Sequence, residues 1–147
     1  MKVAILVSGE GSTLRRFVKR ELPITVVIAD RPYSAYTSAR SAHLPAHLIE
    51  REDFSPSFDR EAYTQKVLQV LIEYGIDLVV MAGWKTLLSP TLFYVFGDMV
   101  LNSHPSLLPD FKGPNAVRDA LEASRRLDGP IYTGCTVFRA TAKMDEG

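Results

Sequence analysis

The fold of this chain is decided by Val3-Ala4-Ile5-Leu6-Val7-Ser8-Gly9-Glu10-Gly11-Ser12, close to its N-terminus. The continuous apolar run of residues 3–7 predicts a strand that is buried on both faces. A serine and two glycines interrupt this run, and residues 14 to about 22 then have the character of a short basic helix. A buried strand followed by a glycine-containing turn and a helix is typical of an α/β protein with a parallel sheet.

The same alternation of strand and helix continues along the chain. Apolar runs predict further strands at 24–29, 46–49, 77–81, 99–101 and 131–139. Helical spacing or favourable N-terminal residues predict helices within 31–43, at 58–74, from Ser89-Pro90 onward and at 115–123. The order of these elements predicts one domain over residues 1–147, built on a mostly parallel sheet with right-handed crossovers.

The composition is that of an ordinary globular protein, with 46% hydrophobic and 23% charged residues in 147. Lysine plus arginine equals aspartate plus glutamate at 17 each, so no overall charge favours binding to nucleic acid. The sequence shows no signal peptide and no apolar run of membrane-spanning length, and we expect no membrane partner. Cys135 is the single cysteine. A single cysteine cannot form an internal disulfide, which fits a reducing cytoplasm. Its apolar surroundings in the sequence favour a buried structural thiol.

Four polar or irregular segments follow predicted strands, at 8–13, 83–88, 102–109 and after Arg139. In parallel sheets, ligands bind beyond the carboxyl ends of the strands. We therefore expect these four segments to converge on one crevice, which would hold the site of any chemistry.

The third segment carries the most specific pattern, Leu101-Asn102-Ser103-His104-Pro105-Ser106-Leu107-Leu108-Pro109. Side chains two residues apart on a strand point the same way, so Asn102 and His104 are expected to face one substrate together. The amide would be a fixed hydrogen-bond donor and the imidazole a proton carrier. Spacing alone leaves ordinary turn chemistry open as the alternative.

The string Asn-x-His-Pro-Ser-Leu-Leu-Pro resembles the signature of the folate-dependent formyltransferases, and the resemblance runs from Lys2 to the last residue. It implies a Rossmann-like sheet with helices on both faces, the formyltransferase N-terminal fold. It also implies 10-formyltetrahydrofolate as co-substrate, no metal, and Asn102, His104 and Asp145 as catalytic residues. Members of the family continue past this aspartate, so the chain is expected to lack C-terminal elements. Asp145 is then expected to be poorly held.

The first segment has the outline of a phosphate site, because glycines allow close approach and a helix N-terminus offers free N–H groups. A dinucleotide fingerprint would need a third glycine where Leu14 stands. The segment resembles the phosphate loop of the glycinamide ribonucleotide branch of the family, which implies that Gly11, Ser12 and Thr13 hold the substrate phosphate. Glu10 must then point outward. Asp30, after the second strand, is expected to be a solvated turn residue.

The second segment, Met81-Ala82-Gly83-Trp84-Lys85-Thr86-Leu87-Leu88-Ser89-Pro90, resembles the folate-binding segment of the family. The resemblance implies folate contacts from residues on three parts of the chain: Arg60, Lys85, Thr86, Leu87, Leu88 and Asn102. Core packing fits Trp84 and Leu87 equally well, and a solvated helix charge fits Arg60. In the last segment, the family usually has histidine where this chain has Phe138.

The resemblance implies transfer of a formyl group from 10-formyltetrahydrofolate to the amine of glycinamide ribonucleotide, in de novo purine biosynthesis. Two alternatives stay open. One is another folate-dependent reaction, namely formyl transfer to a different amine or formyl-folate hydrolysis. The other is a non-catalytic protein that binds folate or phosphate. The expected partners are small-molecule substrates, with self-association through an uncovered sheet edge as a further expectation.

Overall fold

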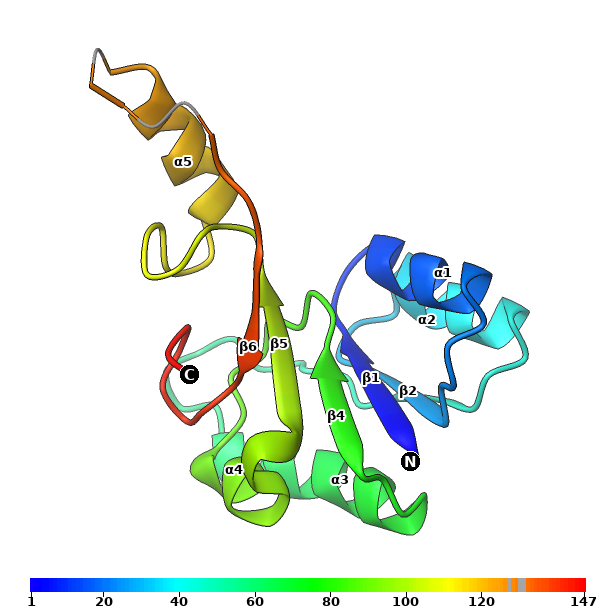
Figure 1. Cartoon of the computed structure of the whole chain (residues 1–147). Helices are drawn as coiled ribbons and strands as arrows, with labels where there is room; N and C mark the ends of the chain where they lie inside the picture. The colour runs from blue at the N-terminus through cyan, green and yellow to red at the C-terminus, as the bar shows by residue number, and fades with distance from the viewer. Residues whose placement is uncertain (127, 130–131) are drawn as a thin grey trace.

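The computed structural model describes residues 1–126, 128–129 and 132–147. The elements alternate between strand and helix from the first residues to α5, as the apolar runs predict (Figure 1). In chain order they are β1 (Val3–Val7), α1 (Ser12–Lys19), β2 (Val26–Ala29), α2 (Ser34–Ser41), β3 (Ala46–Leu48), α3 (Arg60–Glu73), β4 (Leu78–Met81), α4 (Pro90–Phe96), the 3-10 turn η1 (Gly97–Met99), β5 (Val100–His104), α5 (Ala116–Ser124) and β6 (Thr136–Arg139).

The strands form one six-stranded sheet in the order β3-β2-β1-β4-β5-β6. Every neighbouring pair is parallel except β5 and β6, which run antiparallel. The predicted mostly parallel sheet is therefore confirmed. The strand order reverses between β1 and β4, which is the Rossmann-like arrangement and marks the edge where ligands bind in such folds.

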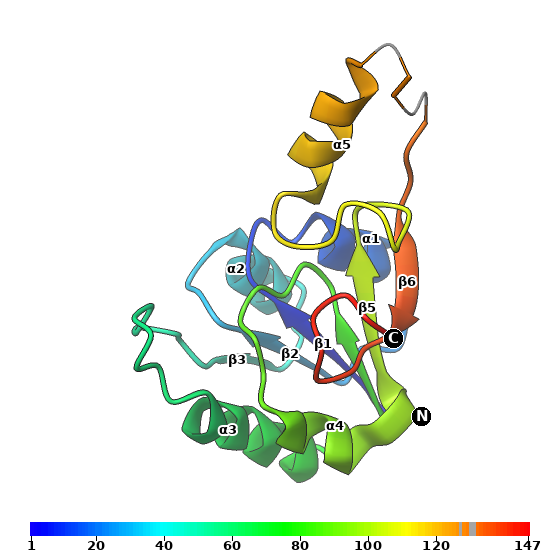
Figure 2. The ribbon, with the colours of Figure 1, turned by 90° about the vertical axis from the view of Figure 1, so that its left-hand side faces the viewer.

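Helices cover both faces of the sheet, and the alternation of side chains along β1 explains how. Ala4 and Leu6 point to one face and Ile5 and Val7 to the other, and all four are at most 2% exposed. The first face packs against α3 and α4 through Tyr63, Val67, Leu71 and Leu92. The second packs against α1 and α2 through Leu14, Ala35 and Ala39. In Figure 2, α5 projects beyond the carboxyl end of β5 instead of covering the sheet.

The last strand is shorter than predicted. The run 131–139 forms a strand only from Thr136 to Arg139, and Ile131 lies outside the described residues. Cys135 precedes β6 and is exposed, so the expectation of a buried thiol is wrong. The physical reason is position, because β6 is an edge strand with neighbours on one side only. Among the described residues, no helix is long and apolar enough to cross a membrane.

Replacing Glu61 by glutamine should make the protein less sensitive to acid. Hydrogen bonds from the side chains of Ser89, Gln65 and Thr91 lower the pKa of Glu61 from its ordinary value of 4.5. A carboxyl whose pKa is lower in the folded state stabilises the fold above its unfolded pKa and loses this effect as the pH falls through the folded pKa. The free energy of unfolding should therefore fall less steeply below pH 4.5 in Glu61→Gln than in the wild type.

Urea denaturation at a series of pH values from neutral to acid measures this difference. Glu73→Gln, at the exposed far end of α3, is the matched control and should follow the wild-type curve. Parallel acid curves for the wild type and Glu61→Gln would contradict the assigned role of the carboxylate.

Candidate active site

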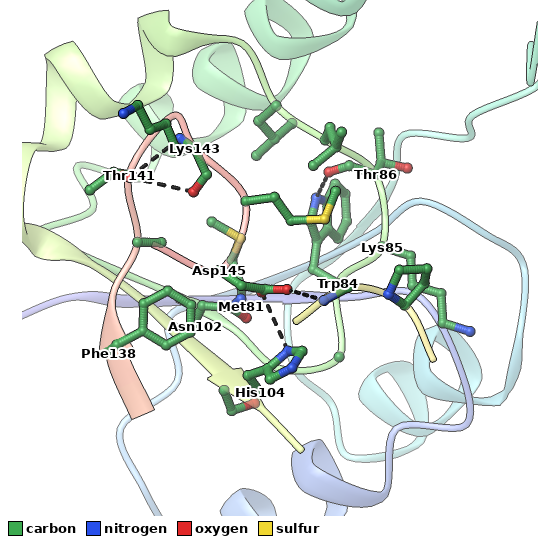
Figure 3. A pocket seen from close by; sticks show the side chains of 18 of the residues that line it. Met81, Trp84, Lys85, Thr86, Asn102, His104, Phe138, Thr141, Lys143 and Asp145 are labelled. Carbon is green, nitrogen blue, oxygen red and sulfur yellow. Dashed lines mark hydrogen bonds and ion pairs between the residues drawn. The ribbon is translucent and has the colours of Figure 1, made fainter. Parts of the chain in front are cut away.

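A cavity of about 540 Å³ opens at the carboxyl ends of β4 and β5. Most of its walls come from the loop after β4, the end of β5, residues 113–114 and the segment that follows β6 (Figure 3). Arg51, Phe93 and Phe138 complete the lining. Its volume is in the range of ligand-binding pockets. A crevice beyond the strand ends is thus present, and three of the four predicted segments line it.

Asn102 and His104 both line this cavity, as the strand pattern predicts. They belong to β5, where antiparallel pairing sets Asn102 opposite Phe138 and His104 opposite Thr136. Phe138 also lines the cavity, so a phenyl ring stands beside the Asn102 amide. His104 is only 6% exposed, which limits its access to substrate to the cavity side.

Both ring nitrogens of His104 face acceptors. Nε2 lies 2.9 Å from the Phe111 carbonyl oxygen, and Nδ1 lies 3.3 Å from a carboxylate oxygen of Asp145. An imidazole with hydrogens on both nitrogens satisfies both contacts at once. The orientation of the ring is therefore fixed by the protein before any ligand binds.

Asp145 is held firmly, contrary to the expectation from its place near the last residue. Its side chain is 8% exposed. One carboxylate oxygen accepts a hydrogen bond of 2.7 Å from the Gly113 backbone N–H, while the other faces His104. An ion pair of 3.3 Å between Lys112 and Glu146 joins the same two segments. These contacts with the loop before α5 supply the order that chain position alone does not.

The loop after β4 forms a second wall of the cavity. Lys85, Thr86, Leu87 and Leu88, the predicted folate-contacting residues of this loop, all line it. Leu87 is 41% exposed and so is not core, whereas Leu88 is buried. Trp84 both lines the cavity and packs against the core, and its indole N–H donates a hydrogen bond of 2.6 Å to the Thr86 carbonyl.

Arg60, for which the resemblance implies a folate contact, is not among the residues that line the cavity. It is the exposed first residue of α3, which covers a face of the sheet and not its carboxyl edge. Arg51 lines the cavity instead and stacks over the Phe58 ring, 4.2 Å from its centroid. Sequence reasoning missed Arg51, although its place just after β3 brings it to the carboxyl edge of the sheet.

Gly11, Ser12 and Thr13 lie at the start of α1 and do not line this cavity, so the four segments do not share a single crevice. Gly11 has a left-handed backbone with φ 71°, and a Cβ there would meet Ala35 of α2 at 2.8 Å. Packing against α2 therefore requires this glycine whatever the loop binds.

The N-terminus of α1 carries no side-chain cap, which leaves backbone N–H groups free for an anion. Glu10 is exposed and accepts a hydrogen bond from Ser34, as predicted for an outward carboxylate.

Asp30 is fully buried, and the expectation of a solvated turn residue is wrong. Its carboxylate accepts a hydrogen bond of 2.6 Å from the Thr86 hydroxyl, 56 residues away in the sequence. The described residues contain no group of three or more His, Cys, Asp or Glu side chains that could hold a metal ion.

Comparisons with known proteins identify the family of this chain. The model of the formyl transferase family matches residues 1–147. The chain is 34% identical to the trifunctional purine biosynthetic protein adenosine-3 of Bos taurus over 99% of its own length, but it spans only 14% of that protein. It is 29% identical to phosphoribosylglycinamide formyltransferase of Bacillus subtilis, over 99% of this chain and 74% of the relative.

Among solved structures, glycinamide ribonucleotide transformylase 1 from Symbiobacterium toebii superposes with a TM-score of 0.85 at 34% identity. The match covers 100% of this chain and 69% of that protein. The family model matches every residue, and the structural similarity supports the same family. The chain belongs to the formyl transferase family.

Proposed function

We propose that the protein transfers a formyl group from 10-formyltetrahydrofolate to the amine of glycinamide ribonucleotide. The observation that carries this proposal is the meeting of Asn102, His104 and Asp145 in one cavity beside the loop after β4. The names of the similar proteins, phosphoribosylglycinamide formyltransferase and glycinamide ribonucleotide transformylase, support the same reaction.

The charge of the cavity suits an anionic ligand. Its lining holds three cationic side chains, Arg51, Lys85 and Lys143. Among the described residues, Asp145 is the one acidic side chain that lines it. Formyl-folate carries carboxylates on its tail and an apolar ring system, and the walls offer cations together with Leu87 and Leu88. Lys85, Thr86, Leu87, Leu88 and Asn102 are the residues that we propose contact the folate.

The proposed reaction needs no nucleophile from the protein. The amine nitrogen of the ribonucleotide attacks the formyl carbon, and the bond between this carbon and the folate nitrogen then breaks. One proton leaves the amine and one is delivered to the folate nitrogen. The Asn102 amide donates to the oxyanion that develops on the formyl oxygen. Imidazolium at His104 stabilises the same charge and supplies the proton, while Asp145 orients the ring.

The loop before α1 is the proposed phosphate site of the ribonucleotide. Gly11, Ser12 and Thr13 present the free N–H groups of the helix N-terminus. The loop is next to the cavity because β1 pairs with β4, and the Lys85 backbone N–H donates to the Ser8 hydroxyl at 2.7 Å. A substrate held by its phosphate at α1 would extend across this contact toward His104. The reducing cytoplasm is the compartment in which we place this activity.

Turnover measured with and without the acceptor tests the proposal. The chain is incubated with 10-formyltetrahydrofolate, and loss of the formyl-folate is followed by absorbance while mass spectrometry detects formylated glycinamide ribonucleotide. Formyl-folate loss that depends on the ribonucleotide supports transfer. Equal loss without the acceptor selects hydrolysis, and calorimetric binding of the folate without turnover selects a non-catalytic binding protein.

A further inference from the structure

Asp30 is a fully buried carboxylate that the proposed chemistry does not use. It directly follows β2, and its Oδ2 accepts the hydrogen bond from Thr86. The second oxygen, Oδ1, is buried without a hydrogen bond among the described residues and lies 3.8 Å from Nε of Arg31. Removing a carboxylate from water is unfavourable unless partners compensate, and here the compensation is partial. Folding alone therefore does not explain why a carboxyl side chain stands at this position.

The partner of Asp30 points to its role. Thr86 lines the cavity and is 2% exposed. Its backbone carbonyl accepts a hydrogen bond from the indole N–H of Trp84. The intervening residue, Lys85, is tied through its backbone N–H to Ser8. Three consecutive loop residues are thus fixed by contacts, two of which come from the ends of other strands.

The sheet order makes the Asp30 contact a long-range one. β2 and β4 are not neighbours, because β1 lies between them. Asp30 at the end of β2 therefore reaches past β1 to the loop after β4, and Ser8 at the end of β1 adds the second tie. Asp30 itself does not line the cavity, so any effect on a ligand passes through Thr86.

We propose that Asp30 and Thr86 form a positioning pair that holds loop 83–88 in the shape that receives the formyl-folate. The part of this proposal that concerns folate affinity rests on the proposed function, whereas the part that concerns loop shape does not. Asp30 is a positioning residue because it touches neither substrate. The Asp30 carboxylate accepts its hydrogen bond from the Thr86 hydroxyl. A variant that keeps the size of Thr86 and removes only this hydroxyl therefore tests the contact by itself.

Thr86→Val is that variant, and Thr86→Ser restores the donor. The chain has one tryptophan, Trp84, which lies in the loop and bonds Thr86, so its fluorescence reports on loop shape. Thr86→Val should shift the Trp84 emission and increase its quenching by acrylamide. It should also raise KM for formyl-folate about tenfold while kcat stays within about threefold, as expected for the loss of one buried hydrogen bond that orients a binding loop. Thr86→Ser keeps the donor to Asp30, so its Trp84 emission and acrylamide quenching should stay close to those of the wild type.

The matched control is Thr25→Val, which removes a hydroxyl that accepts from the Val3 backbone N–H at the opposite end of the sheet. All variants are compared at a temperature where thermal unfolding shows them folded. Unchanged Trp84 fluorescence in Thr86→Val, or equal changes in Thr25→Val, would overturn the positioning role. Fluorescence needs no turnover, so a chain without transferase activity still tests the loop, and failure of the proposed function is recognised separately.

Discussion

Replacing His104 by alanine should lower kcat for formyl transfer by about 10²–10⁴-fold, the usual contribution of a positioned general acid. The imidazole is held between the Phe111 carbonyl and Asp145, inside the cavity that Asn102 also lines. Alanine removes the proton donor and the cationic partner of the oxyanion together. Calorimetric binding of the formyl-folate should persist, because the loop after β4 is left intact.

His47→Ala is the matched control for this experiment. His47 lies in β3, is half-buried and bonds the Tyr74 hydroxyl at 3.1 Å, away from the residues that line the cavity. It should lose some stability and keep its turnover. A loss of binding as large as the loss of turnover in His104→Ala would show that the imidazole holds the site together and does not perform proton transfer.

The sheet was predictable because its strands are buried on both faces. Residues 3–7 are apolar without interruption, and the structure covers them with α1 and α2 on one side and α3 and α4 on the other. Such a run carries its own signal in the sequence. The edge strand β6 has neighbours on one side only, and there the apolar stretch extended beyond the four residues that pair.

The placement of Asn102 and His104 was predictable for a local reason, since their spacing on one strand sets a shared direction. The resemblance grouped Asp145 with His104, but the residues themselves did not reveal the contacts that order Asp145 and bury Asp30. Asp145 is ordered by Gly113 and His104, and Asp30 by Thr86, which lies 56 residues along the chain. No pattern within a single segment reports such partners. A sequence shows that a carboxylate follows a strand, but not whether a donor from another loop will bury it.

The resemblance implies a folate contact for Arg60, and the structure places this residue at the start of a helix that packs on the face of the sheet, outside the cavity lining. Arg51, which lacks a motif, lies in the lining because β3 ends at the carboxyl edge. At this cavity the end of a strand, and not a motif, brings an arginine to the lining.

Asn102→Ala should lower kcat by about 10²–10³-fold, the effect expected from removing one donor to a developing oxyanion. Asn102 lines the cavity from the same strand as His104, so its amide and the imidazole both border the cavity in which we propose that the oxyanion develops. Steady-state kinetics at saturating formyl-folate measures the loss. Asn115→Ala is the control, since Asn115 is exposed and lies outside the cavity lining.

Asn102→Asp separates the charge of the side chain from its shape. Aspartate has nearly the size of asparagine, but its ionised carboxylate only accepts hydrogen bonds and would repel an oxyanion. If the amide acts as a donor, the aspartate variant should be at least as slow as the alanine variant, although it fills the space opposite Phe138. An aspartate variant clearly faster than alanine would mean that Asn102 works by filling the cavity wall. The oxyanion would then have to be stabilised by His104 alone.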